Sequence, residues 1–267
     1  MFRLAQLSDL HLVRAGRLCM DRVDTAALLD AALAALRPLR PDALLLSGDL
    51  SDDGSPASYA GLRERLRALG LPCVLLPGNH DERGALRDAF PEQWPAGTGP
   101  GEALCQDRAL GPLRVLALDT LRPGRADGGL DSAQLDWLAD ALARQRDRPT
   151  LLALHHPPRA LGLPFMDAMR LFDGADALAR VVARAPQLLK LLCGHVHRHI
   201  ETTFAGRPLS VAPSCAHQIV LGAPGAYEAA WRLEPPGLLL HDWDDGLGLL
   251  THHVAVGDFG PPQHYGD

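Results

Sequence analysis

Side chains that can bind metal ions or transfer protons gather in five short segments of this chain. The segments span 8–11, 48–54, 78–81, 155–158 and 194–197, and the groups they offer are Asp9, His11, Asp49, Asn79, His80, His155, His195 and His197. Their donors are carboxylate oxygens, an amide oxygen and imidazole nitrogens, with no thiolate among them. This mixture suits divalent first-row metals such as Mn, Fe, Co or Zn better than a soft metal or a calcium cage.

The number of candidate ligands points to more than one ion. They are Asp9, His11, Asp49, Asn79, His155, His195 and His197. If one carboxylate bridges, they supply about four ligands to each of two ions, and paired ions roughly 3.5 to 4 Å apart can clamp the attacking and leaving oxygens of a phosphoryl group. A glycine precedes Asp49, Asn79 and His195, and we expect it to let the backbone turn and approach the ions closely.

Each segment also has an ordinary explanation when it is taken alone. Asp-x-His is common in loops, Gly-Asp after a strand is often a turn, and Gly-Asn-His can be a left-handed turn with a surface histidine. The pair His195 and His197 can equally be two surface histidines on one face of a strand. All five segments in this order, each at the end of a predicted strand, are hard to obtain by chance. The joint pattern therefore predicts one site.

The predicted elements explain how distant segments can meet. Apolar runs predict strands at 2–7, 43–47, 72–76, 113–118, 150–154 and 188–193. Amphipathic stretches between them predict helices at 21–36, 55–69, 81–90, 131–146 and 174–185. Strands that alternate with helices indicate βαβ units and a largely parallel sheet, and ligands bind such sheets at the carboxyl ends of the strands.

The pattern changes after Gly194, where extended pieces follow one another closely. They lie at 200–204, 208–211, 227–233, 238–242 and 249–256, and they suggest hairpins of a second, mixed or antiparallel sheet. The expected fold is α/β, a four-layer αββα sandwich of two mixed sheets flanked by helices. We expect a single domain, with a catalytic core over 1–215 and C-terminal strands over 216–267 that cap the site, complete the second sheet and end in an unanchored tail.

Composition limits the class of protein. The chain has 267 residues, and 47% of them are hydrophobic, which excludes disorder as the main state. Its formal net charge of -6 and its 5% aromatic residues argue against a nucleic-acid polymer as partner. We find no apolar run long enough to span a membrane and no signal peptide, so we expect a cytoplasmic protein. Five cysteines without a Cys-x-x-Cys pair argue against a disulfide framework. The twelve histidines are the unusual feature.

Taken together, the five segments resemble the calcineurin-like metallophosphoesterase superfamily. Its motifs are Asp-x-His, Gly-Asp-x-x, Gly-Asn-His-Asp/Glu, a strand-end histidine and Gly-His-x-His, and the match runs from Asp9 to His197 without a missing element. Segments 48–54, 155–158 and 206–213 are similar to the branch of class III cyclic-nucleotide phosphodiesterases and bacterial glycerophosphodiesterases. The stretch 164–170 and the pair His217-Gln218 are similar to the glycerophosphodiesterases in particular.

The resemblance implies a role for each residue. It assigns Asp9, His11 and His197 to one divalent ion and Asn79, His155 and His195 to the other, with Asp49 bridging as part of the catalytic centre. It also implies that His80 and His217 are catalytic. The substrate is expected to contact Asn79, His80, His197 and His217. The implied reaction is attack of a metal-activated hydroxide on a small phosphodiester, a cyclic nucleotide or a glycerophosphodiester-like compound, by a chain able to form a homo-oligomer. His156 is expected to support the ligand beside it.

Three alternatives remain open. A phosphomonoesterase or a metal-dependent nuclease of the same superfamily would use the same residues, although 32 acidic against 26 basic residues disfavour the nuclease. A non-catalytic sensor of phosphate or nucleotides could keep the fold and the metals. The presence of His80 beside Asn79 argues against a sensor, since a binding module does not need a proton donor. The loop 157–174 could form a leaving-group pocket or simply pack on the core.

Overall fold

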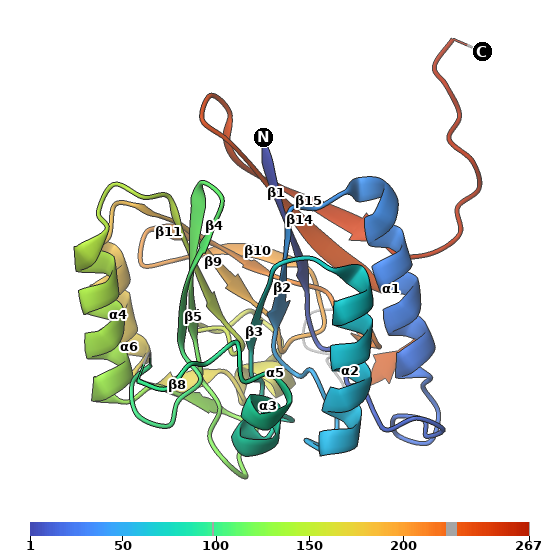
Figure 1. Ribbon diagram of the computed structural model, residues 1–267, viewed down its shortest axis with the longest axis horizontal. Coiled ribbons are helices and arrows are strands. Elements are labelled where there is room, and N and C mark those ends of the chain that lie inside the picture. The colour runs from blue at the N-terminus through green and yellow to red at the C-terminus, as the bar shows by residue number, and fades with distance from the viewer. Residues whose placement is uncertain (98, 223–228, 267) are drawn as a thin grey trace.

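Two large β-sheets face each other at the centre of the molecule, and helices cover their outer faces (Figure 1). The computed structural model describes residues 1–97, 99–222 and 229–266. The first sheet has the order β15-β14-β1-β2-β3, with the bounds β1 Phe2–Leu7, β2 Ala43–Ser47, β3 Cys73–Leu76, β14 Gly237–Asp244 and β15 Gly248–Ala255. Strands β1, β2 and β3 are parallel, and β14 and β15 are antiparallel to their neighbours.

The second sheet has the same mixed character. Its order is β10-β11-β9-β7-β5-β4, with the bounds β4 Gln106–Leu110, β5 Leu113–Leu118, β7 Thr150–Leu154, β9 Leu188–Cys193, β10 Ile200–Phe204 and β11 Arg207–Val211. Strands β5, β7, β9 and β11 are parallel, while β4 and β10 are antiparallel edge strands. Two short pairs complete the set: β6 Gly128–Gly129 with β8 Leu171–Asp173, and β12 Gln218–Ile219 with β13 Trp231–Arg232.

The helices lie on the two outer faces, α1 and α2 on one side and α4 and α6 on the other (Figure 1). Their bounds are α1 Thr25–Leu39, α2 Pro56–Leu69, α3 Arg83–Ala89, α4 Ser132–Arg144, α5 Pro164–Asp167 and α6 Ala175–Ala183. Side chains cap the first turns of two of these helices. Ser55 caps α2 with proline at its first position, and Asp131 and Gln134 form a capping box on α4.

Alternating side chains build three cores, as the pleat of a strand requires. In β2, Leu45 lies in the core between the two sheets, while Leu44 and Leu46 lie in the core beneath α1 and α2. In β7, Leu151 joins the core between the sheets and Leu152 the core beneath α4 and α6. The four-layer αββα architecture expected from the sequence is therefore confirmed.

The longer strands after Gly194 join the two large sheets instead of forming a sheet of their own, which corrects the sequence interpretation. Strand β11 pairs with β9 in the second sheet, whereas β14 pairs with β1, so the C-terminal hairpin completes the first sheet. Apolar patterning marks a strand as buried but does not name its partner. The predicted strand 227–233 is reduced to Trp231–Arg232, and its residues 227 and 228 lie outside the described part of the chain.

Part of the loop 157–174 packs on the core. Leu163, Met166 and Leu171 are buried in the core beneath α4 and α6, while Phe165 and Phe172 are exposed. Residues 257–266 form an exposed segment that leads away from the body of the molecule (Figure 1). Among the described helices, none has the length and apolar character needed to cross a bilayer.

Candidate metal centre

Five strand ends bring the predicted site residues together. Strands β1, β2 and β3 end just before Asp9, Asp49 and Asn79, and β7 and β9 end just before His155 and His195. The side chains form three groups whose ligand atoms lie within 4.8 Å of one another: Asp9, His11, Asp49 and His197; His155, His156 and His195; and His11, Asp52 and His80. Segments nearly two hundred residues apart thus share one edge of the sandwich, as the sequence predicts.

The first group presents ring nitrogens that face each other. His11 donates from Nδ1 to the Asp52 carboxylate at 2.9 Å, and His197 donates from Nδ1 to the His217 carbonyl at 2.8 Å. Because each Nδ1 is the donor, the neutral form of each ring offers a lone pair at Nε2. The two Nε2 atoms lie 3.0 Å apart, and Asp9 Oδ1 is 3.4 Å from that of His197. Facing acceptors at this distance repel unless a cation or a proton lies between them.

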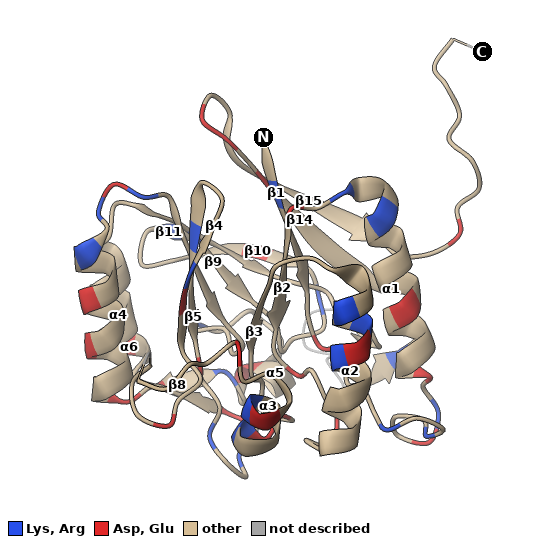
Figure 2. Cartoon of the chain, in the orientation of Figure 1, with Lys and Arg blue, Asp and Glu red and all other residues tan. Residues whose placement is uncertain are grey.

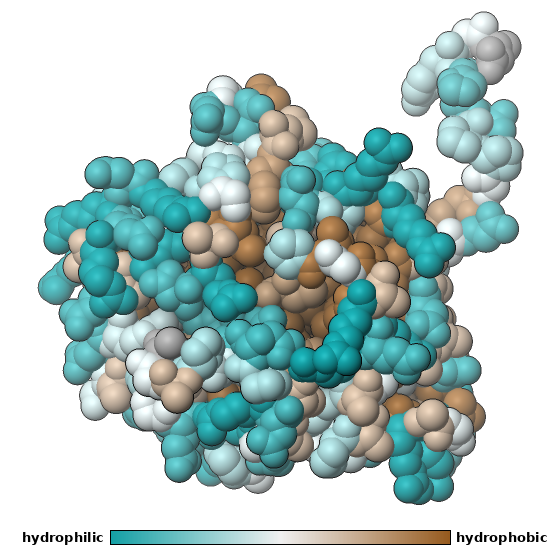
Figure 3. Space-filling model, in the orientation of Figure 1, coloured by the Kyte–Doolittle hydropathy of each residue, from teal (hydrophilic) through white to brown (hydrophobic). Residues whose placement is uncertain are grey.

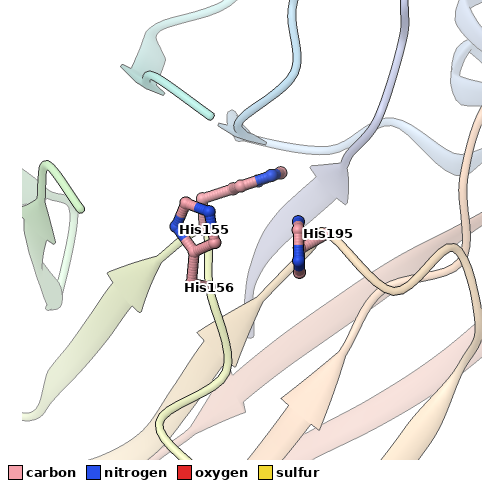
Figure 4. Close-up of side chains that lie close together, drawn as sticks. All are labelled: His155, His156 and His195. Atoms are coloured by element: carbon pink, nitrogen blue, oxygen red, sulfur yellow. The ribbon is translucent and has the colours of Figure 1, made fainter. Parts of the chain in front are cut away.

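The second group and the neighbouring Asn79 contain buried polar atoms without a hydrogen-bond partner. His155 donates from Nδ1 to the Ser47 carbonyl at 2.8 Å, and its Nε2 has no hydrogen-bond partner. His195 Nε2 and Asn79 Oδ1 are likewise buried and unpartnered. Figure 4 shows His155 and His195 at the ends of neighbouring strands β7 and β9. Since an unsatisfied buried polar atom costs about 1–3 kcal/mol, several in one place indicate a missing ligand.

His156 belongs to the same group by distance but differs in its bonding. Its Nδ1 lies 2.8 Å from Thr120 Oγ1, and its Nε2 lies 3.2 Å from the Ala126 carbonyl. The carbonyl can only accept, so Nε2 carries the proton and Nδ1 accepts from the hydroxyl. Both nitrogens are therefore engaged within the protein, and His156 packs beside His155 and His195 without a free lone pair. This agrees with the supporting role expected from the sequence.

Asp49 lies between the two groups. Its Oδ2 is 3.6 Å from His11 Nε2 and 3.4 Å from His155 Nε2. Burial raises the pKa of this carboxyl, but His155 outweighs it and holds the pKa well below its usual range. For Asp9, burial also raises the pKa, and His197 lowers it to about 2. Both carboxylates are therefore charged at neutral pH, as cation ligands must be.

The backbone of the site is strained. Asp9, His11, Asp49, His195 and His197 all have positive φ angles, of 53°, 45°, 48°, 73° and 51°. Such conformations cost of order 1–3 kcal/mol each in residues other than glycine and gather at functional sites. We infer that the strand ends are bent to aim these side chains inward.

The three glycines of the motifs make room for the ligands. A β-carbon built on Gly48 would lie 2.2 Å from His155 Nδ1, one on Gly78 2.2 Å from Asp49 Oδ1, and one on Gly194 2.0 Å from Ser8 Oγ. Only Gly48 also has a positive φ, of 98°. A β-carbon at any of the three would therefore crowd neighbouring atoms, and at Gly78 and Gly194 it is this steric crowding that excludes a larger residue.

His80 stands at the open side of the cluster, with 41% of its side chain exposed. Its backbone N–H donates to Asp49 Oδ1 at 2.9 Å, and its Nδ1 donates to the Asp52 carbonyl at 3.1 Å, which leaves Nε2 free. Burial lowers the pKa of His80, but Asp49 and Asp52 outweigh it and raise that pKa above its usual value. Asp52 thus contacts both His11 and His80. The sequence pattern does not mark this role, although Asp52 lies in the same segment as Asp49.

His217 closes the other side of the cluster. Its ring centre lies 4.6 Å from that of His197 and 5.4 Å from that of His11. Its Nδ1 is buried without a partner, and burial lowers its pKa to about 3, so the ring is neutral near pH 7. The structure therefore brings His217 to the predicted site.

Two nearby aspartates stabilise the surrounding loops. Asp81 accepts hydrogen bonds from the backbone of Leu50, Ser51 and Gly78, so it joins the loop after β2 to the loop after β3. Asp119 accepts two hydrogen bonds from Arg83, at 2.6 and 3.0 Å, and takes no part in the three groups.

Outside the cluster, the described residues form a surface of mixed charge and an apolar cavity. Figure 2 shows basic and acidic residues interleaved along α2, and the view displays no continuous basic stripe. An apolar hollow is visible in Figure 3, and a cavity of about 630 Å³ between α2 and β4 is lined by residues such as Leu66, Phe90 and Leu110. No residue of the cluster lines that cavity.

A two-sheet sandwich with carboxylate, amide and imidazole ligands at its strand ends defines an α/β protein built to hold divalent metal ions. The comparisons with known proteins agree with this class. The family model of the calcineurin-like phosphoesterases matches residues 2–199, and the chain belongs to that family.

Named relatives cover most of the chain. It is 32% identical over 268 residues to a probable glycerophosphodiester phosphodiesterase of Arcobacter nitrofigilis, an alignment that covers 99% of this chain and 97% of the relative. It is 38% identical over 239 residues to a probable cyclic nucleotide phosphodiesterase of Synechococcus, covering 88% of each. It is 34% identical to the 3′,5′-cyclic adenosine monophosphate phosphodiesterase of Escherichia coli K12, covering 81% of this chain and 77% of the relative.

Solved structures support the fold. A dimetal phosphatase from Danio rerio superposes with a TM-score of 0.65 at 16% identity, covering 96% of this chain and 99% of the other. A purple acid phosphatase from yellow lupin gives 0.69 at 15% identity, covering 96% of this chain and 52% of the other. At these identities the likeness concerns the fold alone.

Proposed function

We propose that this protein is a metal-dependent phosphodiesterase that hydrolyses small phosphodiesters at a dinuclear centre. One observation carries the proposal: His11 Nε2 and His197 Nε2 face each other at 3.0 Å beside Asp9 and Asp49. The names of the relatives support diesters as the substrate class, because they are glycerophosphodiester and cyclic nucleotide phosphodiesterases.

The residues present fit two divalent ions. Asp9, His11 and His197 would hold one ion, Asn79, His155 and His195 would hold the other, and Asp49 would contribute to both. The unpartnered atoms Asn79 Oδ1, His155 Nε2 and His195 Nε2 support the second set. When bound, the ions would lower the pKa of a water molecule and neutralise the charge of the phosphate. Mn, Fe, Zn and Co all suit these donors.

The chain itself supplies proton transfer and positioning. His80 is proposed to protonate the leaving oxygen or to stabilise charge on it, because its Nε2 is free and its pKa is raised. Asp52 holds the rings of His11 and His80 by its carboxylate and its carbonyl, and so fixes their orientation. His217 is proposed to contact the substrate from the opposite side through its unpartnered Nδ1.

A comparison of two chromogenic substrates tests the proposal. We expect the purified protein, supplied with Mn²⁺, to hydrolyse bis(p-nitrophenyl) phosphate with a higher kcat/KM than p-nitrophenyl phosphate. A preference for the monoester would indicate a phosphatase instead. No turnover of either compound would indicate a binding protein for phosphate or nucleotides. A panel of 3′,5′-cAMP, 2′,3′-cyclic nucleotides and glycerophosphodiesters would then identify the substrate.

Three further parts of the proposal rest on the sequence. They are a cytoplasmic location, the division of the chain at residue 215 into a core and a cap, and assembly into a homo-oligomer. Cell fractionation, limited proteolysis and light scattering would test them in turn.

A further inference from the structure

A short strand pair beside the cluster carries an aromatic ring close to the histidines. Strand β12 begins directly after His217, and its residue Ile219 pairs with Trp231 of β13. The ring centre of Trp231 lies 5.0 Å from that of His217, which lies 4.6 Å from that of His197. A row of rings therefore leads from a proposed metal ligand to Trp231.

An ion pair holds this strand pair against the site. Arg198 follows His197 directly, and its guanidinium donates to both carboxylate oxygens of Glu234 at 2.5 and 2.7 Å. The same guanidinium donates from Nε to the Ile219 carbonyl. Bidentate pairs of this kind fix geometry as well as adding energy. Both strands are thus tied to the loop that carries His197, so the position of Trp231 is defined relative to the cluster.

The exposure of Trp231 suits a contact with a bound molecule. Its side chain is half-buried, so part of the indole is covered and part is open to solvent. An indole face can stack on any nucleobase or other planar aromatic ring. Each stacked base raises the affinity about tenfold or more. A glycerol or alkylamine group has no such face and gains much less.

We propose that Trp231 is a specificity-determining residue that receives the planar ring of a nucleoside or aryl group esterified to the phosphate. This inference rests on the proposed phosphodiesterase activity and deepens it. It separates diesters that carry an aromatic group from those that carry only glycerol and an alkylamine.

The test compares two substrate classes in variants of the metal-loaded protein. For Trp231→Ala we expect the KM for 3′,5′-cAMP and bis(p-nitrophenyl) phosphate to rise about tenfold, with kcat and the KM for glycerophosphocholine changed by less than about twofold. Trp231→Phe restores most of the KM because it keeps an aromatic face. Calorimetry should show the same loss for equilibrium binding of AMP.

Two controls separate recognition from folding. Trp137→Ala removes another half-buried indole, from α4, and should leave every KM unchanged. Trp231→Leu keeps apolar bulk without a ring and should behave like the alanine variant. An equal rise of KM for both substrate classes, or no rise for either, overturns the inference. Turnover of glycerophosphocholine without turnover of any aromatic diester overturns it too, whereas no diester turnover at all contradicts the proposed function itself.

Discussion

Gly78→Ala tests most sharply how the loops position the proposed ligands. The φ of Gly78 is not in the left-handed region, so alanine is compatible with its backbone and the effect of the change is steric. The new β-carbon would lie 2.2 Å from Asp49 Oδ1 and 2.7 Å from His155 Nε2. Real β-carbons essentially never approach other atoms within 3.0 Å. Two proposed ligands must therefore move.

The size of the movement sets the expected loss. To reach ordinary van der Waals contact at 3.4 Å, the Asp49 carboxylate must shift by about 1 Å, whereas metal sites tolerate deviations of about 0.2 Å. We expect metal affinity to fall about 100-fold or more and turnover to fall by about the same factor. Overpacking should also lower the free energy of unfolding of the metal-free protein by about 1–3 kcal/mol.

Gly61→Ala is the matched control for this change. Gly61 lies inside α2. A β-carbon built on it would have the flexible guanidinium of Arg65 as its nearest neighbour, at 3.5 Å. Alanine there should raise the free energy of unfolding by about 0.5–1 kcal/mol and leave the metal site intact. The assays are metal content after dialysis, diester turnover and denaturant unfolding. Full metal content and turnover in Gly78→Ala would refute the reasoning.

Three further predictions concern histidines. His80→Ala should keep the metal content of the wild type and lower kcat by about 10²-fold or more, and unchanged turnover would remove His80 from the mechanism. Burial lowers the pKa of His155, but Asp49 outweighs burial and raises that pKa to about 9. Metal binding at pH 7.5 should therefore release a proton from His155, which can be measured as a binding enthalpy that depends on the buffer. Burial lowers the pKa of His241 to about 3, so the unfolded chain takes up a proton below pH 6.5 that the folded chain refuses. His241 should therefore contribute its full stability above pH 6.5 and lose it as pH drops toward 3, by about 2 kcal/mol at pH 5, so His241→Gln should reduce the acid destabilisation of the metal-free protein by about that amount in denaturant unfolding.

The sequence predicted local structure where a local signal exists. The strand 113–118 and the helix that starts after Asp131 were predicted correctly, because a run of apolar residues and an amphipathic stretch are properties of neighbouring residues. The convergence of the five motifs also followed from the sequence, since parallel strands end at one edge of a sheet.

Contacts between distant segments could not be predicted in the same way. The pairing of β14 with β1 joins strands near opposite ends of the chain, and the apolar pattern of a strand does not name its partner. The role of Asp52 depends on two rings that reach it from 41 and 28 residues away. The place of Trp231 beside His217 depends on the ion pair between Arg198 and Glu234, which no spacing in the sequence marks.

A metal titration of the metal-free protein tests the central claim most directly. We predict that Mn²⁺ or Zn²⁺ binds at two ions per chain, and that Asp49→Ala, which removes the proposed bridge, fails to retain both. A stoichiometry of one ion or none, or two ions held with wild-type affinity by the Asp49→Ala variant, would contradict the proposed dinuclear centre.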